Sequence, residues 1–304
     1  MKKKAVIVGV GGQDGSYLSE LLVSKGYQIV GIRKGELDLA KADSVIRFVA
    51  DHMPDEVYYL AAHHHSSEQS KDLVNKEMSR VVNLMGPTHF LAGIRLHTPA
   101  TRFFYASSSH IFAPSDRPLN ELSKRAPENL YAQMKIAAME VCEEYRKVHG
   151  IFASVGILFN HESPRRPPHF LTQKVATAAH EISLGKRSEL ILGDLEAKVD
   201  WGYAPDFVRG MWLGLQHSVS MDYVLATGKI HSVKDLVERV FKLFDLDWQK
   251  YVKASHYPSG LLNFSRCGDY SKANQILGWQ PLTEFNDLLH LLVVSKKCGG
   301  ETSI

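Results

Sequence analysis

Short apolar runs alternate in the first part of the chain with segments whose apolar residues recur at helical spacing. Residues 5–8 are apolar throughout, and the apolar positions between Tyr17 and Leu22 repeat every three to four residues until Gly26 interrupts them. A second apolar run follows over 29–32. A continuous apolar run is typical of a buried parallel strand, whereas the three-to-four spacing is typical of a helix with one buried face. The pattern therefore predicts a strand, a helix ending near Gly26, and a second strand.

The same alternation continues to about residue 158. It predicts helices over 42–49, 76–95 and around Tyr131, and strands over 56–62, 102–107 and 153–158. Strands that alternate with helices indicate an α/β protein with a doubly wound parallel sheet. Ligands of such sheets lie at the carboxyl ends of the strands. Beyond this region, residues 233–244 and 282–294 predict two further amphipathic helices.

Glycine recurs at a spacing of three directly after the first strand. Gly9, Gly12 and Gly15 form a G-x-x-G-x-x-G turn that leads into the first helix. Backbone N–H groups of such a turn, together with the helix N-terminus, can hold a pyrophosphate. The alternative is a glycine-rich turn without a ligand, which the strand and helix on either side make the weaker interpretation.

The end of the second strand is basic. An acidic residue there would bind the adenosine ribose of NAD(H), but the chain has Arg33 and Lys34. Two cations suit a 2′-phosphate, so the sequence favours NADP(H), the alternative being a solvated basic loop.

Tyr131 and Lys135 are four residues apart in a predicted helix, and therefore lie on one helix face. A lysine ammonium beside a tyrosine hydroxyl favours the phenolate, so we expect Lys135 to lower the pKa of Tyr131. Such a tyrosine can move a proton at a sugar hydroxyl while a nicotinamide moves the hydride. A Tyr-x-x-x-Lys match by itself is more often a solvated helix face, so the interpretation depends on its neighbours.

Polar residues follow three of the predicted strands. Residues 107–110 and 160–166 follow two strands of the predicted sheet, and His63, His64 and His65 follow another. Adjacent side chains on an extended chain diverge, so the three histidines favour a polar loop near the site over a metal site.

Composition narrows the class of protein. The chain has 304 residues, 44% of them hydrophobic and 23% charged, as in ordinary soluble proteins. A net charge of +3 does not indicate nucleic-acid binding, and no apolar run is long enough to cross a bilayer. Three widely spaced cysteines indicate neither a disulfide framework nor a zinc site, which favours a reducing cytoplasm.

Several of these residues together carry a family resemblance. The glycine turn, Leu60-Ala61-Ala62, Asn83, Ser108 and the Tyr131/Lys135 pair resemble the extended short-chain dehydrogenase/reductases. Longer stretches are similar to the GDP-mannose 4,6-dehydratase branch of that family, over residues 12–18, 156–166, 200–208, 223–228 and 268–273. The likeness extends from residue 5 to about 292.

The resemblance implies an NADP(H)-binding Rossmann domain over residues 1–160. Residues 161–304 would form mainly a smaller substrate-binding lobe, with some segments returning to the Rossmann domain. The substrate would be a nucleotide-diphosphate sugar, GDP-linked by the likeness, and the reaction would be transient oxidation at sugar C4 with loss of water across C5 and C6. The Arg165/Arg166 loop would approach a neighbouring subunit's cofactor site, which implies a homodimer or homotetramer.

The resemblance also implies roles by position. The catalytic residues would be Ser108, His110, Tyr131 and Lys135. The cofactor would be bound by Gly9, Gly12, Gln13, Asp14, Gly15, Arg33, Asp38, Leu39, Leu60, Ala61, Ala62, Tyr131, Lys135, Leu158, Asn160, His161 and Arg166. The substrate would be bound by Ser109, Asn160, Lys174 and Arg266.

Four departures from the family pattern concern dehydration and phosphate binding. His110 stands where the family has a glutamate base, and Val199 stands where it has a phosphate-binding arginine. An Arg-Pro pair is missing from 258–267, where Arg266 is the nearby cation, and the insert after the second strand is absent. Histidine can act as a base near neutral pH, so dehydration stays possible.

Three hypotheses follow. The first is a GDP-sugar 4,6-dehydratase with His110 as its base. The second is a 4-ketoreductase or C4 dehydrogenase on a related GDP-sugar, motivated by the missing glutamate and the shortened loop. The third is a binding or regulatory protein on a former enzyme scaffold, motivated by Val199 and the missing Arg-Pro pair, since fold and motif do not by themselves determine function.

Overall fold

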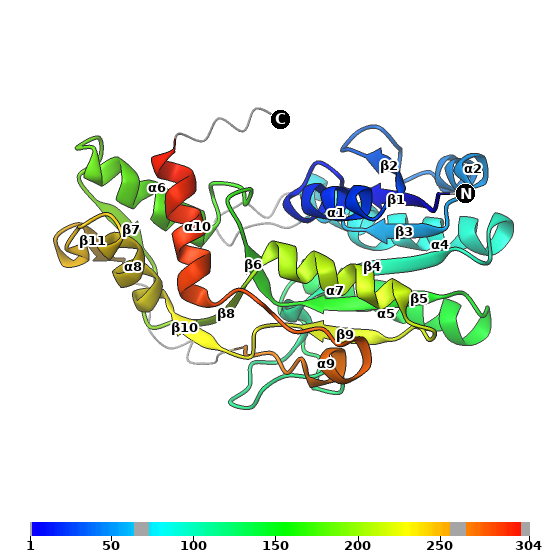
Figure 1. Cartoon of the computed structure of the whole chain (residues 1–304). Helices are drawn as coiled ribbons and strands as arrows, with labels where there is room; N and C mark the ends of the chain where they lie inside the picture. Colours follow the sequence, from blue (N-terminus) through cyan, green and yellow to red (C-terminus); the bar gives the residue numbers. More distant parts are fainter. Residues whose placement is uncertain (1, 64–72, 256–265, 299–304) are drawn as a thin grey trace.

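The computed structural model describes residues 2–63, 73–255 and 266–298 (Figure 1). Its largest layer is a six-stranded sheet in the order β2-β1-β3-β4-β5-β9, in which every neighbouring pair is parallel. The strands are β1 (Lys4–Val8), β2 (Gln28–Ile32), β3 (Glu56–Tyr59), β4 (Arg102–Ser108), β5 (Ala153–Leu158) and β9 (Asp222–Leu225). This confirms the doubly wound parallel sheet that the alternation predicts.

Helices cover both faces of this sheet (Figure 1). The α1 helix (Gln13–Ser24) packs with α7 (Ala204–Gln216) on one face. The other face carries α2 (Ala42–His52), α4 (Gly86–His97) and α5 (Leu130–Val148). Strands β1, β3, β4 and β5 are buried almost throughout, as expected for parallel strands with helices on both sides.

The predicted helix over 76–95 is interrupted. The structure has α3 (Leu73–Arg80), a π-helical turn (Val81–Met85) and α4. Asn83 lies within the π turn, where its side-chain amide donates to the His63 carbonyl at 3.0 Å and its oxygen accepts from the His63 N–H at 3.2 Å. A π turn changes the direction in which a side chain leaves a helix. Here it directs Asn83 at the loop that follows β3.

A second hydrophobic core lies beside the first. It is built from a three-stranded sheet in the order β10-β8-β6, a two-stranded sheet of β11 and β7, and three helices. The strands are β6 (Asn160–Glu162), β7 (Leu190–Leu192), β8 (Lys198–Tyr203), β10 (Ile230–Ser232) and β11 (Val252–Ala254). The helices are α6 (Leu171–Ser183), α8 (Val233–Lys242) and α10 (Phe285–Lys297). Trp201, Leu236 and Phe285 are among its buried residues.

Three elements after residue 160 pack against the first core rather than the second. These are α7, β9 and α9 (Ser271–Leu277), and Trp279 is fully buried behind them. Between the two cores, β6 continues the chain directly from β5, so the carboxyl end of the parallel sheet faces the second core (Figure 1). Among the described helices none is long and apolar enough to cross a membrane.

Candidate active site

The glycine turn after β1 is closed so tightly that side chains would not fit. A Cβ on Gly15 would lie 2.2 Å from the Gly9 carbonyl oxygen, and a Cβ on Gly9 would lie 2.9 Å from the Ala61 nitrogen. Gly9 also has a φ of +94°, which favours glycine. The α1 helix then begins at Gln13, and its N-cap, Gly12, has no side chain to satisfy the first N–H groups. This is the geometry of a helix N-terminus that can receive an anion.

The first turn of α1 is braced against the strand that leaves the parallel sheet. Gln13 accepts a hydrogen bond from the Ser163 hydroxyl at 2.8 Å and donates to the His161 carbonyl at 3.1 Å. The Asp14 carboxylate lies 2.9 Å from Nε2 of His161, whose Nδ1 is 2.7 Å from the Phe159 carbonyl. These contacts link the glycine turn to residues 159–163.

Asp14 and His161 shift each other's pKa values. Burial acts to raise the pKa of Asp14, but the charge of His161 and its hydrogen bond outweigh burial and hold that pKa below 3.8. Burial likewise acts to lower the pKa of His161, and Asp14 outweighs it, so that pKa lies above 6.5. The two side chains are 19% and 9% exposed. They therefore form a nearly buried ion pair at the helix N-terminus.

Both arginines of the loop after β6 are held within their own chain. The Arg165 guanidinium lies 4.0 Å from the ring centre of Tyr17 and donates to Ser16 at 3.0 Å and to Glu20 at 2.6 Å. Arg166 lies 3.7 Å over the Phe170 ring and 3.6 Å from Glu162. Its buried Nε has no hydrogen-bond partner among the described residues. The expected approach to a neighbouring subunit stays a prediction.

The basic end of β2 lies beside the glycine turn. A Cβ on Gly11 would be 3.7 Å from Cγ of Arg33, so the exposed Arg33 side chain runs along the turn. Asp38 is exposed and pairs with Lys41, while Leu39 is half-buried and its carbonyl oxygen lies 3.0 Å from Nδ1 of His89. Asp38 and Leu39 follow Arg33 in the chain, and within the described residues no hydrogen bond or ion pair joins them to the glycine turn.

The loop after β3 is the second backbone surface near the turn. Leu60 and Ala61 follow β3 directly, and the backbone of Ala61 is the atom group that Gly9 approaches. Ala62 is exposed, and Asn83 holds the following residue, His63, through both of its backbone groups. A ligand at the turn would therefore meet backbone on two sides.

Tyr131, Lys135 and Ser108 meet at the carboxyl end of β4. Asn129 caps α5 by accepting from the Ala132 N–H at 2.9 Å, which places Tyr131 in the first turn. Lys135 is 1% exposed, and its ammonium donates to the Ala106 carbonyl at 2.8 Å and lies 5.5 Å from the Tyr131 ring centre. Within the described residues no carboxylate pairs with Lys135. Burial lowers its pKa to about 7.

The expected lowering of the Tyr131 pKa by Lys135 is wrong for this structure. Burial raises the pKa of Tyr131 to about 12, while a hydrogen bond from Ser108 and the charge of Arg166 act to lower it. Lys135 contributes no lowering, because its ammonium is directed to the Ala106 carbonyl and its own pKa is near neutrality. The spacing of four residues placed both on one face, as predicted, but it did not determine their protonation.

A cavity of about 190 Å³ opens next to this group. It is lined by Ser109, His110, Phe159, Asn160, Ala197, Lys198, Val199, Asp200 and Arg266. The His110 ring meets the Tyr131 ring edge-on at 6.4 Å, and its backbone N–H donates to the Ser108 hydroxyl at 3.3 Å. Burial, followed by the charge of Arg266, lowers the pKa of His110 below 6.5. His110 is therefore neutral at pH 7 and able to accept a proton.

The structure brings most of the predicted substrate residues to this cavity, but not all. Ser109, Asn160 and Arg266 line it, whereas Lys174 lies in the first turn of α6 and is absent from the described lining. Leu158 ends β5 and is buried between its partners in β4 and β9.

Two charged lining residues were missed by the sequence interpretation, Lys198 and Asp200. The alternation in residues 198–203 carries the signal, since it places Lys198 and Asp200 on one face of β8 and Val199 and Trp201 on the other.

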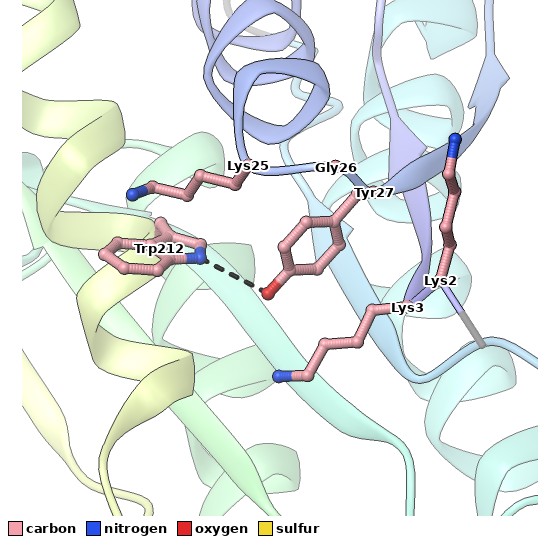
Figure 2. A pocket seen from close by; sticks show the side chains of 6 residues that line it. All are labelled: Lys2, Lys3, Lys25, Gly26, Tyr27 and Trp212. Atoms are coloured by element: carbon pink, nitrogen blue, oxygen red, sulfur yellow. Dashed lines mark hydrogen bonds between the residues drawn. The ribbon is translucent and has the colours of Figure 1, made fainter.

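A larger cavity, of about 530 Å³, lies at the opposite end of the parallel sheet (Figure 2). Lys2 and Lys3 lie at the amino end of β1, and Tyr27 precedes β2. Figure 2 shows Lys25 over Trp212, with the ammonium 3.8 Å from the ring centre. Ligands of doubly wound sheets bind at the carboxyl ends of the strands, so the smaller cavity is the candidate site.

The histidine loop offers no metal site that the structure can describe. His63 is held by Asn83, and His64 and His65 lie outside the described residues. Within residues 2–63, 73–255 and 266–298, no three His, Cys, Asp or Glu side chains group as metal ligands would.

Known proteins share both the sequence and the fold. The family model described as GDP-mannose 4,6 dehydratase matches residues 35–292. GDP-mannose 4,6 dehydratase 2 of Arabidopsis thaliana is 35% identical, over 96% of this chain and 86% of its own length. GDP-mannose 4,6-dehydratase of Sinorhizobium fredii is 34% identical over 94% of both chains, and that of Homo sapiens is 31% identical over 95% and 90%.

Solved structures extend the likeness to the fold alone, because their sequences are distant. RMD from Pseudomonas aeruginosa, complexed with NADPH, has a TM-score of 0.86 at 20% identity and covers 98% of this chain and 99% of its own. dTDP-glucose 4,6-dehydratase from Bacillus anthracis, in complex with NAD, has a TM-score of 0.82 at 16% identity, over 99% and 98%. With a family match across most of its length and relatives above 30% identity, the chain belongs to the GDP-mannose 4,6-dehydratase family of extended short-chain dehydrogenase/reductases.

Proposed function

We propose that this protein is an NADP(H)-dependent nucleotide-sugar 4,6-dehydratase acting on a GDP-linked hexose. The observation that carries the proposal is the cavity at the end of β4, where His110 and Asn160 lie beside the Tyr131–Lys135 helix. In this site, Tyr131 and Ser108 would act on a sugar hydroxyl, and His110 would remove a proton from a sugar carbon. The names of the relatives supply the substrate class.

The residues present fit NADP(H). The glycine turn and the N-terminus of α1, where no side chain caps the first N–H groups, suit a pyrophosphate, and Arg33 beside Gly11 suits a 2′-phosphate. The unpartnered Nε of Arg166 would gain an acceptor near the same turn. Lys135 would donate to the nicotinamide ribose. When bound, NADP⁺ accepts the hydride from sugar C4 and later returns it.

Tyr131 and Ser108 would serve the C4 hydroxyl. Tyr131 would remove the hydroxyl proton as the hydride leaves C4, and Ser108 would hydrogen-bond the C4 oxygen. In the structure the pKa of Tyr131 is about 12, so a protonated Lys135 or the bound cofactor's positive charge must lower it before Tyr131 can act as a base.

His110 would serve the dehydration. Its neutral imidazole would take the proton from C5, whose acidity rises once C4 is a ketone, and would give that proton to the C6 hydroxyl, which leaves as water. One C–H and one C–O bond break, a C5–C6 double bond forms, and the hydride then returns to C6 as a proton adds at C5. The lowered pKa of His110 predicts that turnover falls on the acid side only below pH 6.5.

The test is to incubate purified protein and NADP⁺ with GDP-mannose and to follow both the nicotinamide absorbance and the product mass. A product lighter by one water, with no net absorbance change, supports the dehydratase. A steady absorbance change with a two-hydrogen mass difference would instead establish the 4-ketoreductase or C4 dehydrogenase. Cofactor binding without turnover on a panel of GDP-hexoses would contradict both and leave a binding protein.

Substitutions at His110 sharpen the test. His110→Gln removes the base and should abolish water loss, while oxidation at C4 in a single turnover persists. His110→Glu restores the family's residue and should retain product formation. A His110→Gln variant with unaltered dehydration would remove His110 from the mechanism.

We also infer a cytoplasmic homodimer or homotetramer, as the family resemblance implies. Light scattering of the purified protein measures the number of subunits, and a monomer at working concentrations would contradict this part.

A further inference from the structure

The lining of the substrate cavity contains two cationic side chains, Lys198 and Arg266. Its carboxylate, Asp200, is fully occupied by the protein. One oxygen accepts from the Thr227 N–H at 2.9 Å and hydroxyl at 2.6 Å, and the other accepts from the N–H groups of Gly228 and Gly268 at 3.0 and 3.1 Å. Asp200 therefore builds the cavity wall, and the charge offered to a ligand is positive.

Three consecutive residues of β8, Lys198, Val199 and Asp200, line the cavity, and their side chains differ in what else they contact. Val199 and Trp201 pack against the second hydrophobic core. Because successive side chains of a strand point to opposite faces, Lys198 and Asp200 lie on the other face. Asp200 reaches the Thr227 hydroxyl and the Gly268 N–H. The valine is thus used for packing, and the residue before it carries the charge.

The two cations, Arg266 and Lys198, differ in the contacts that they already make within the protein. The Arg266 guanidinium donates to the Phe112 carbonyl at 3.2 Å and to Glu128 at 3.3 Å, and its backbone bridges to Val199. Lys198 is exposed, and the described residues include no ion-pair partner for it. Lys198 can therefore bind a ligand without first breaking an ion pair within the described residues, whereas Arg266 would have to give up contacts.

We propose that Lys198 binds the diphosphate of the nucleotide-sugar and replaces the cation that Val199 lacks. This inference rests on the proposed function, since a nucleotide-diphosphate ligand is what that function requires. A lysine ammonium is a compact charge with three rotatable donors, whereas an arginine binds phosphate through a planar fork. Lys198 therefore holds the diphosphate by charge rather than by a two-point hydrogen-bonding geometry, with Arg266 as the second cation of the cavity lining.

The first experiment measures GDP binding by calorimetry to the full chain saturated with NADPH. Lys198→Ala should weaken GDP binding by about ten- to a hundredfold, as expected for loss of one charge-assisted hydrogen bond. Lys198→Glu should weaken it further, and Lys198→Arg should restore most of it. The matched control is Lys242→Ala, an exposed lysine in the last turn of α8. NADPH affinity and the melting temperature should be unchanged in every variant.

A second readout separates this inference from the proposed function. In turnover, Lys198→Ala should raise the KM for the nucleotide-sugar with kcat within about twofold, because a uniform binding contact is lost. If GDP binds and the Lys198 variants weaken its binding while no GDP-hexose is converted, the assignment of Lys198 to the diphosphate is supported. The proposed dehydratase activity is then contradicted. Unchanged GDP affinity in both Lys198→Ala and Lys198→Glu, or no GDP binding to the parent protein, would overturn the inference.

Discussion

Two buried ionisable pairs lie at the carboxyl ends of the parallel strands, and the protein treats them in opposite ways. Asp14 and His161 carry opposite charges at 2.9 Å, and each stabilises the other's charged form. Tyr131 and Lys135 also lie close together, but burial disfavours the charged form of both. Within the described chain, Lys135 forms no ion pair with a carboxylate.

The difference separates a structural pair from a functional one. The Asp14–His161 pair is complete, and it joins the cofactor turn to the strand that leads into the second core. It also balances the Asp14 charge, which would otherwise oppose an anion at the α1 N-terminus. The Tyr131–Lys135 pair is incomplete without a ligand, and strongly shifted groups in a cleft are typical of active sites.

The largest expected effect comes from Tyr131→Phe. It removes the proton relay from the incomplete pair and should lower kcat by about 10²–10⁴-fold while leaving the fold intact. Tyr145→Phe in the same helix is the matched control and should not change the rate. Steady-state kinetics with the nucleotide-sugar measure both, and an unchanged rate in Tyr131→Phe would place Tyr131 outside the reaction.

Lys135→Met should change stability in a way that depends on pH. The folded pKa is about 7 and the ordinary value is 10.5, so between these values the unfolded chain binds the proton more readily. The free energy of unfolding of the parent protein therefore rises with pH across this window, relative to Lys135→Met, by a few kcal/mol in total. Lys147→Met, an exposed lysine of the same helix that pairs with Glu143, should show no such trend.

Urea unfolding from pH 7 to 10 measures this difference. A constant offset between Lys135→Met and the parent protein would mean that Lys135 stays charged in the fold, contrary to the structure. The same variant should lose activity, since it cannot hold a cofactor ribose.

His161→Gln breaks the complete pair. It leaves the buried Asp14 carboxylate without its cationic partner, which should cost about 1–3 kcal/mol of stability. Adding Asp14→Asn should recover part of that loss, whereas His97→Gln on the exposed end of α4 should cost almost nothing. Additive losses in the double variant would show that the two residues do not interact.

The smallest expected effect is the pH dependence of the stability that the Asp14–His161 pair contributes. The contribution of His161 is fully present below 6.5 and is lost as pH rises through its higher folded pKa. That of Asp14 is present above 3.8 and is lost as pH falls through its lower folded pKa. The cost of His161→Gln should therefore be greatest between pH 3.8 and 6.5 and shrink at neutral pH and above. A cost that grows with pH would contradict the assignment.

The sequence predicted the parallel sheet and the shared helix face of Tyr131 and Lys135 because both depend on local spacing. The run at residues 153–158 became β5 with the same bounds, and Tyr131 and Lys135 came to one helix face. The helix over 76–95 was predicted as continuous, because nothing local indicates that Asn83 bonds to His63 across the fold. Lys198 was missed for a related reason, since its importance depends on what Val199 packs against.

By itself, then, the sequence determined the order of strands and helices up to residue 158 and the tight glycine turn, because both follow from spacing along the chain, and its motifs indicated the family. Only the tertiary structure decided which charges are paired. It places Asp14 against His161 across 147 positions of sequence and directs Lys135 to a carbonyl instead of a carboxylate. Burial and partner distance determine a pKa, and both arise only when distant segments pack together.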